Sequence, residues 1–382
     1  MKKKKKNNRQ QWIGMGIYLL VGAVCGLFMS HLILTEDHPS LDSMLLDLLG
    51  LILMMLATLY FHTITHELGH LIFGLLTGYR YSSFRVGNLA WVKTEGKIRF
   101  KRYTVAGTGG QCLMVPPEPV DGKIPVVWYN MGGCIVNLIT TAVFYIGYLL
   151  LSKTNPLSAL FLMGTMTGLA TALANGIPLS LNAMDNDGRN ALFLRKDPDS
   201  MEAFRLQLLI SDAQLQDVRL KDMPEAWFPL PPIETMDTAM RAAQGVFYCN
   251  RLMDQHRFEE ASALIDQLLS AEVPMAGIHR EILRCERTYC ELIGENRWSV
   301  IEGLRTKEHL RFLSAMSSSL FVLRVEYAYA LLGEGDEAAA QKKLTRFEKV
   351  VPRHPFPADI AAERELIDIA KSHKEAIENT AE

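Results

Sequence analysis

Apolar residues are distributed unevenly along the 382 residues of the chain. Almost all long apolar runs lie before about residue 195, whereas the remainder mixes charged and apolar positions as soluble proteins do. Four runs are long enough to cross ~30 Å of hydrocarbon as helices. They cover residues 12–34, 44–76, 126–151 and 157–181, and Pro178 breaks the last one. The pattern predicts a polytopic α-helical membrane domain with four transmembrane helices.

Basic residues set the orientation of these helices. Residues 2–6 are all lysine, and the segment 78–127 carries eight Lys or Arg against three acids. The loop 35–43 has no basic residue. By the positive-inside rule, the N-terminus, the segment 78–127 and everything after residue 182 lie in the cytoplasm. We expect a multi-pass protein of a bacterial cell membrane with both termini cytoplasmic, because the 12–34 run is too long for a signal peptide.

The segment 78–127 has no helical pattern. Residues 84–92 and 97–105 place β-branched and aromatic residues between glycines, which favours short strands or hairpins. We expect a small β-containing cytosolic loop that lies against the membrane face. A plain cytosolic loop is the alternative.

The chain after Pro198 has a different composition. A Pro-rich segment, 198–232, is expected to be a linker, and the helical pattern resumes at 233–382. Three similar stretches there place Leu252, Leu292 and Leu331 at the ends of helices, 40 and 39 residues apart. This pattern is similar to tetratricopeptide-like helical pairs and predicts a surface for a protein partner. A helical domain that only packs on the membrane core is the alternative.

The predicted fold is therefore mainly α. Its parts are a basic N-terminus with the first transmembrane helix (1–40), a membrane core (41–197), a linker (198–232) and a cytosolic all-α helical-repeat domain (233–382). A hydrophobic content of 49% excludes an intrinsically disordered chain. A net charge of -2 gives no sign of nucleic-acid binding. The six cysteines form no C-x-x-C pair, so we expect buried, reduced thiols.

The second apolar run ends in a group of ionisable residues. His66-Glu67-Leu68-Gly69-His70 is an H-E-x-x-H motif. On a helix the two histidines lie four apart on one face and can bind one Zn²⁺, while Glu67 can act as the general base. Ionisable residues within a membrane helix are costly and mark functional sites. His62 lies on the same face and is expected to be a neighbour of the site or part of a helix interface.

A zinc hydrolase needs a third protein ligand and an open position. The candidates must lie at the same membrane depth as His66 and His70. Asp185 and Asp187 meet this condition, because they follow the cytoplasmic end of the fourth run. The spacing alone leaves both open.

Three motifs in this order resemble the site-2 protease family of intramembrane zinc metalloproteases, over residues 44–195. The motifs are His66-Glu67-x-x-His70, then Gly132-Gly133-Cys134-x-x-Asn137, then Asn175-x-x-Pro178 followed by Asp187-Gly188. The chain departs from the family pattern in two places. The usual proline of the second motif is missing, and the aspartates lie seven and nine residues after Pro178 instead of about five. The Asp-Gly-Arg run favours Asp187 as the ligand.

The resemblance implies a zinc metalloendopeptidase that cleaves membrane proteins or peptides in or near their transmembrane segments. It implies His66, His70 and Asp187 as zinc ligands and Glu67 as the catalytic base. It also implies strands of the 78–127 segment that pair with the unwound substrate. Asn137 and Asn175 are candidates for substrate binding, with hydrogen bonding between helices as the alternative.

Two other functions stay open at this stage. One is a catalytically silent family member that acts as a membrane-anchored scaffold through its helical repeats. The other is a zinc-dependent membrane protein of different chemistry, such as a transporter. The clustering of the ionisable residues at one membrane depth argues against the transporter.

Overall fold

The computed structural model describes residues 40–105, 108–152, 155–181, 184–271 and 273–381, with Gly16, Ala23 and Gly26 as isolated positions. Apart from these three positions, the predicted first transmembrane helix, 12–34, therefore lies outside the described residues. The chain divides into two compact units. The first contains residues up to Trp91 and Thr104–Met201, and the second contains Val92–Tyr103 and Glu202–Glu382.

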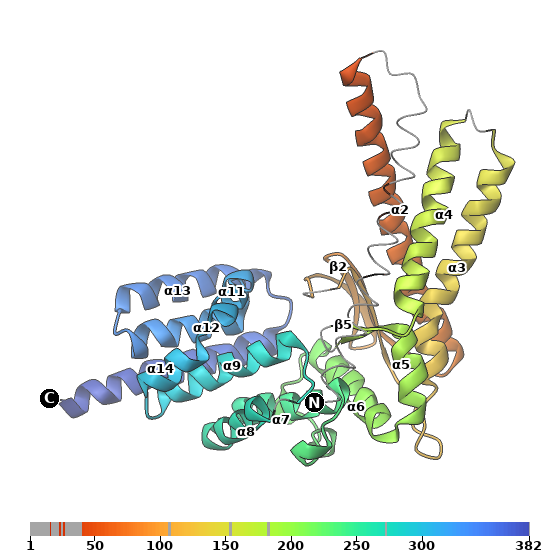
Figure 1. The fold of residues 1–382 in the computed structure, drawn as a ribbon. Helices are drawn as coiled ribbons and strands as arrows, with labels where there is room; N and C mark the ends of the chain where they lie inside the picture. The colour runs from red at the N-terminus through yellow and green to blue at the C-terminus, as the bar shows by residue number, and fades with distance from the viewer. Residues whose placement is uncertain are drawn as a thin grey trace. The chain divides into compact units, whose positions relative to one another are not determined.

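Three long helices form the centre of the first unit (Figure 1). They are α2 (Leu41–Leu76), α3 (Val126–Leu150) and α4 (Pro156–Gly176), and each packs against the other two. In the described part of the chain, these three helices are long and apolar enough to span a membrane, which indicates a membrane protein.

The buried side of α2 is polar, whereas its exposed side is apolar. It buries residues such as Thr65, His66 and His70, while Leu46, Leu53 and other leucines are exposed. This is the arrangement expected when lipid surrounds a helix and function lies inside the bundle.

The backbones of α2 and α3 touch where two glycines meet. A Cβ atom on Gly69 would overlap the carbonyl of Gly132, and a Cβ atom on Gly132 would overlap the carbonyl of Gly69. Small residues allow such close approach between membrane helices. The contact brings the H-E-x-x-H turn of α2 against α3.

The fourth predicted helix ends earlier than its apolar run. It stops at Gly176, because Ile177 precedes Pro178 and adopts an extended conformation (ψ 125°). A short hairpin of β5 (Ser180–Leu181) and β6 (Met184–Asp185) follows, and then helix α5 (Asp187–Phe193). Asp187 is thus the first residue of a separate helix.

The predicted β-containing segment between α2 and α3 is confirmed as an antiparallel sheet. Its strands are β1 (Arg80–Val86), β2 (Leu89–Thr94), β3 (Lys97–Arg102) and β4 (Gly110–Val115), in the order β3-β2-β1-β4. The strands or hairpins expected over 84–92 are present as the hairpin of β1 and β2, with a turn at Gly87, where φ is +59°. The β2–β3 turn has positive φ at Glu95 and Gly96, as tight hairpins require.

The second unit is helical. Its helices include the larger part of α6 (Pro198–Leu215), α7 (Ala239–Asp254), α8 (Phe258–Ser270), α9 (Gly277–Ile293), α10 (Trp298–Leu304), α11 (Lys307–Ala315), α12 (Leu320–Ala328), α13 (Glu337–Val350) and α14 (Pro357–Ala381). Helix ends fall close to Leu252, Leu292 and Leu331, as the sequence predicts. A tetratricopeptide-like relationship among these helical pairs stays a prediction.

The segment 198–232 has more structure than a plain linker. It contains α6 and three short 3₁₀ turns begin within or just after it. Ile210, Met223 and Phe228 form a small buried cluster. These apolar side chains explain why the segment folds onto the helical unit.

The end of the β2–β3 hairpin packs within the second unit. Lys101 Nζ donates a hydrogen bond to the carbonyl of Pro355 at 2.8 Å and lies 4.5 Å from the centre of the Phe356 ring. The ring of Tyr103 also contacts Phe356. Five of the six cysteines lie in the described part of the chain, and all five are free and buried, as expected.

Candidate metal centre

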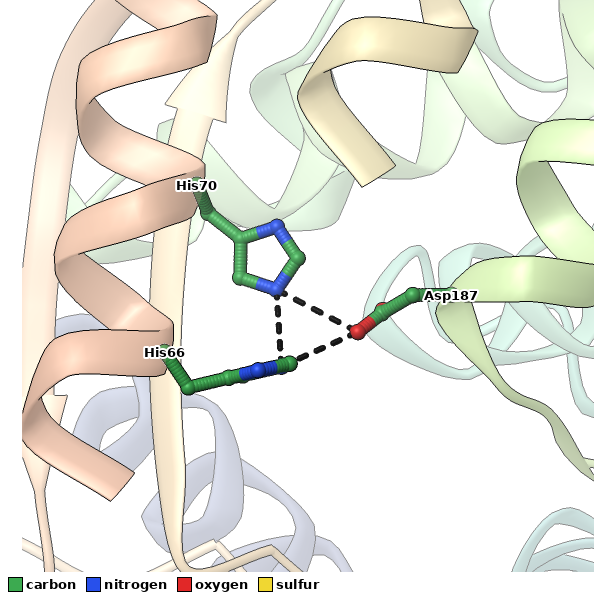
Figure 2. A group of neighbouring side chains, drawn as sticks. All are labelled: His66, His70 and Asp187. Carbon is green, nitrogen blue, oxygen red and sulfur yellow. Dashed lines mark hydrogen bonds and ion pairs between the residues drawn. The ribbon is translucent and has the colours of Figure 1, made fainter. Parts of the chain in front are cut away.

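Two histidines of α2 and one aspartate of α5 point toward a common centre (Figure 2). His66 Nε2 lies 3.1 Å from His70 Nε2 and 3.0 Å from Asp187 Oδ2. His70 Nε2 lies 3.4 Å from the same carboxylate oxygen. One ligand atom from each residue lies within 4.8 Å of the others, and both histidines are buried. The three residues can hold one metal ion.

The protonation of these residues fits a metal ion. Nδ1 of His70 lies 2.7 Å from the carbonyl oxygen of Tyr129, which can only accept, so Nδ1 carries a proton and the neutral ring would present a lone pair at Nε2 to a metal ion. Burial alone would raise the pKa of Asp187, but the charge of His70 and hydrogen bonds with both histidines lower it below its ordinary value. An ionised carboxylate therefore faces the imidazole nitrogens. Two imidazoles and one carboxylate are a common ligand set of catalytic zinc.

Two glycines provide the space in which His66 and Asp187 take these positions. A Cβ atom on Gly133 of α3 would lie 2.5 Å from Cε1 of His66. A Cβ atom on Gly188 would overlap the carbonyl of Gly176. The φ of Gly188 is not positive in the structure, so a left-handed backbone is not the reason for a glycine here. Its role is instead to let the start of α5 touch the end of α4.

Asn186 fixes Asp187 and was not recognised from the sequence. Its Oδ1 accepts hydrogen bonds from the main chain of Arg189 (3.1 Å) and Leu179 (3.0 Å). Its Nδ2 donates to the carbonyls of Ala174 (2.8 Å) and Ile177 (2.6 Å). Asn186 is thus the N-cap of α5 and ties this helix to the end of α4. The preference of helix N-caps for Asn is the signal that could have found it.

Asp185 has a different role from Asp187. It is exposed on β6 and forms an ion pair with Arg189 at 2.8 Å. Of the two aspartates, Asp187 is therefore the one that the fold brings to the histidines.

Glu67 is buried between α2 and the start of β4. A Cβ atom on Gly110 would lie 2.5 Å from Glu67 Oε1, so the strand passes directly over the carboxylate. The main chain of Cys112 also donates a hydrogen bond to Glu67. Strand β4 forms the last position in the sheet order and borders the metal centre at this point.

The remaining candidates lie between the helices. His62 is fully buried, and its Nε2 lies 2.8 Å from the carbonyl of Gly164 on α4, so it belongs to a helix interface as expected. Asn175 donates to the carbonyl of Thr171 in its own helix at 3.0 Å. Asn137 is fully buried beside His66.

Comparison of the chain with protein-family models, with curated proteins and with solved structures found no match.

Proposed function

We propose that the protein is an intramembrane zinc metalloprotease that hydrolyses peptide bonds in or near the transmembrane segments of membrane-bound substrates. One observation carries the proposal. Two imidazoles of α2, a helix long and apolar enough to span a membrane, converge with the ionised carboxylate of Asp187 beside the buried Glu67. Both termini and the sheet are proposed to face the cytoplasm, as the distribution of basic residues predicts.

His66, His70 and Asp187 would hold the zinc ion. A zinc ion held there would supply a Lewis acid for the scissile carbonyl and would lower the pKa of a bound water molecule. Glu67 accepts a proton as the water oxygen attacks the carbonyl carbon, and it returns the proton to the leaving amine when the C–N bond breaks. The hydrogen bond from Cys112 keeps the carboxylate in place for both transfers.

Strand β4 is the proposed guide for the substrate. A peptide bond within a helix is shielded by its own hydrogen bonds, so the substrate must unwind before cleavage. An unwound segment can add to the edge of the sheet at β4, next to Glu67. The resemblance to the site-2 protease family predicts Asn137 and Asn175 as substrate-binding residues. A protein partner or the cytosolic tail of the substrate is proposed to bind the helical second unit.

Cleavage of a labelled single-span peptide by the purified full-length protein in detergent tests this proposal. Glu67→Gln should retain zinc and lose proteolysis, because an amide cannot accept the proton. Glu95→Gln is a matched control, because Glu95 lies in an exposed turn. Activity of Glu67→Gln within a few-fold of wild type would remove Glu67 from the mechanism. A zinc-loaded wild type that cleaves nothing would favour the membrane-anchored scaffold.

A further inference from the structure

Asn137 joins three helices behind His66. Its Nδ2 lies 3.4 Å from Nδ1 of His66 on α2 and 3.2 Å from Oγ1 of Thr171 on α4. Its Oδ1 lies 2.9 Å from Oγ1 of Thr65 on α2. The side chain has no exposed surface. The polar atoms of Asn137 are thus engaged with α2 and α4, and one of them faces the ring nitrogen opposite the metal centre.

The position of the proton on the His66 ring decides whether the oxygen or the nitrogen of the Asn137 amide must face it. Nε2 of His66 points to His70 and Asp187, so a metal ion in the centre would bind Nε2 and leave the proton on Nδ1. That N–H needs an acceptor, and the amide oxygen is the acceptor that Asn137 offers. A half-turn of the amide exchanges its two ends and places Oδ1 against Nδ1 of His66.

The neighbouring hydroxyls are compatible with this half-turn. Thr65 donates to Oδ1 of Asn137 at 2.9 Å, and its proton can turn instead to the carbonyl of His62 at 3.2 Å, so that its oxygen then accepts from Nδ2 of Asn137. The hydroxyl of Thr171 can rotate to donate to Oδ1. The amide then offers His66, Thr65 and Thr171 the donor or acceptor that each needs in the metal-bound state.

Each of the two histidines would then have a hydrogen-bond acceptor at its Nδ1. Nδ1 of His70 has the carbonyl of Tyr129 as its acceptor, and Nδ1 of His66 would have Oδ1 of Asn137. Both acceptors come from α3. Such outer hydrogen bonds fix the tautomer and the orientation of a ligating imidazole.

We propose that Asn137 is a positioning residue, which accepts a hydrogen bond from Nδ1 of His66 and holds Nε2 toward the metal centre. The inference rests on the proposed zinc site and deepens it. It assigns the amide of Asn137 to His66 instead of to the substrate.

Zinc affinity of the full-length protein in detergent, measured by competition with a chromophoric chelator, tests the role. Asn137→Leu removes the acceptor and should weaken zinc binding by roughly 10–100-fold. It should also change the visible spectrum of the Co²⁺-loaded protein. Asn137→Asp keeps an acceptor and should restore both properties to within a few-fold of wild type. Asn130→Leu is the matched control, because Asn130 is buried on the same helix and donates to the carbonyl of Val126 at 2.7 Å.

Two results would overturn the inference. One is a zinc affinity of Asn137→Leu equal to that of the wild type. The other is an equal loss of zinc affinity in Asn137→Leu and Asn137→Asp. A raised KM with unchanged zinc affinity would return Asn137 to substrate binding. If Asn137→Leu does not fold, Asn137→Ser replaces it, because the shorter hydroxyl does not reach Nδ1. A wild type that binds no zinc would instead refute the proposed function, and this inference with it.

Discussion

Nδ1 of His70 lies 2.7 Å from the carbonyl oxygen of Tyr129, so the main chain of α3 orients a side chain of α2. No side-chain substitution removes this partner. Its position depends on how closely the two helices approach, and the contact of Gly69 with Gly132 sets that approach. The candidate metal centre should therefore respond to added methyl groups on α3.

Gly133→Ala should disturb His66 directly. The added methyl group would lie 2.5 Å from Cε1 and 2.6 Å from Nδ1 of the imidazole, so the ring must move. We expect zinc affinity, measured by chelator competition, to fall by about 10-fold or more. Gly176→Ala is the control, because its methyl group would lie 3.5 Å from the sulfur of Cys134, an ordinary contact. Equal affinities of the two variants would contradict the described packing.

Asn186→Ala should loosen Asp187 without removing it. The substitution deletes the hydrogen bonds that join the start of α5 to the end of α4. Loss of an N-cap costs ~1 kcal/mol of stability, and the displaced carboxylate should also lower zinc affinity. Asn155→Ala removes the N-cap of α4, where Oδ1 accepts from Leu157, and should lower stability alone. The result that would contradict this role is an unchanged zinc affinity in Asn186→Ala.

The sequence predicted those parts of the site that depend on local spacing. His66, Glu67 and His70 lie on one helical turn, so the motif alone places the two imidazoles together. The spacing left Asp185 and Asp187 open, and the Asp-Gly-Arg run favoured Asp187, but the position of the carboxylate is not determined locally. It depends on where α4 ends and on the Asn186 hydrogen bonds that orient α5. The contact of Asn137 with His66 depends in turn on the helix crossing at Gly69, which no spacing within one helix reveals.

The second unit should show its own dependence on pH. Hydrogen bonds from Arg297 outweigh burial and, with Arg287, lower the pKa of Glu291 from 4.5 to about 2. Because the folded-state pKa lies below the unfolded value, Glu291 stabilises the fold above pH 4.5, and this contribution is lost as the pH falls toward 2. Glu291→Gln should therefore have a lower Tm at pH 7.

The difference in Tm between wild type and Glu291→Gln should shrink between pH 5 and pH 3. Circular dichroism at 222 nm measures both. Glu295→Gln is the matched control, because Glu295 pairs with the same Arg297 at 3.1 Å but is 73% exposed. A difference in Tm that does not change with pH would show that the carboxylate charge of Glu291 is not what stabilises the turn.

The orientation of the chain gives a further prediction. The basic residues of the segment 78–127 and of residues 2–6 predict that both termini lie in the cytoplasm. A reporter fused after Glu382 should therefore be active only if it works on the cytoplasmic side. Activity of an extracytoplasmic reporter at the same position would contradict this topology.

The zinc affinity of Asp187→Ala beside Asp185→Ala tests the central claim most directly. Asp187 lies 3.0 Å from Nε2 of His66, whereas Asp185 pairs with Arg189. We predict one zinc ion in the wild type, a loss of affinity of about 10-fold or more in Asp187→Ala, and a smaller change in Asp185→Ala. Loss of zinc in Asp185→Ala with full retention in Asp187→Ala would contradict the assigned ligand set, and a wild type without zinc would contradict the metal centre itself.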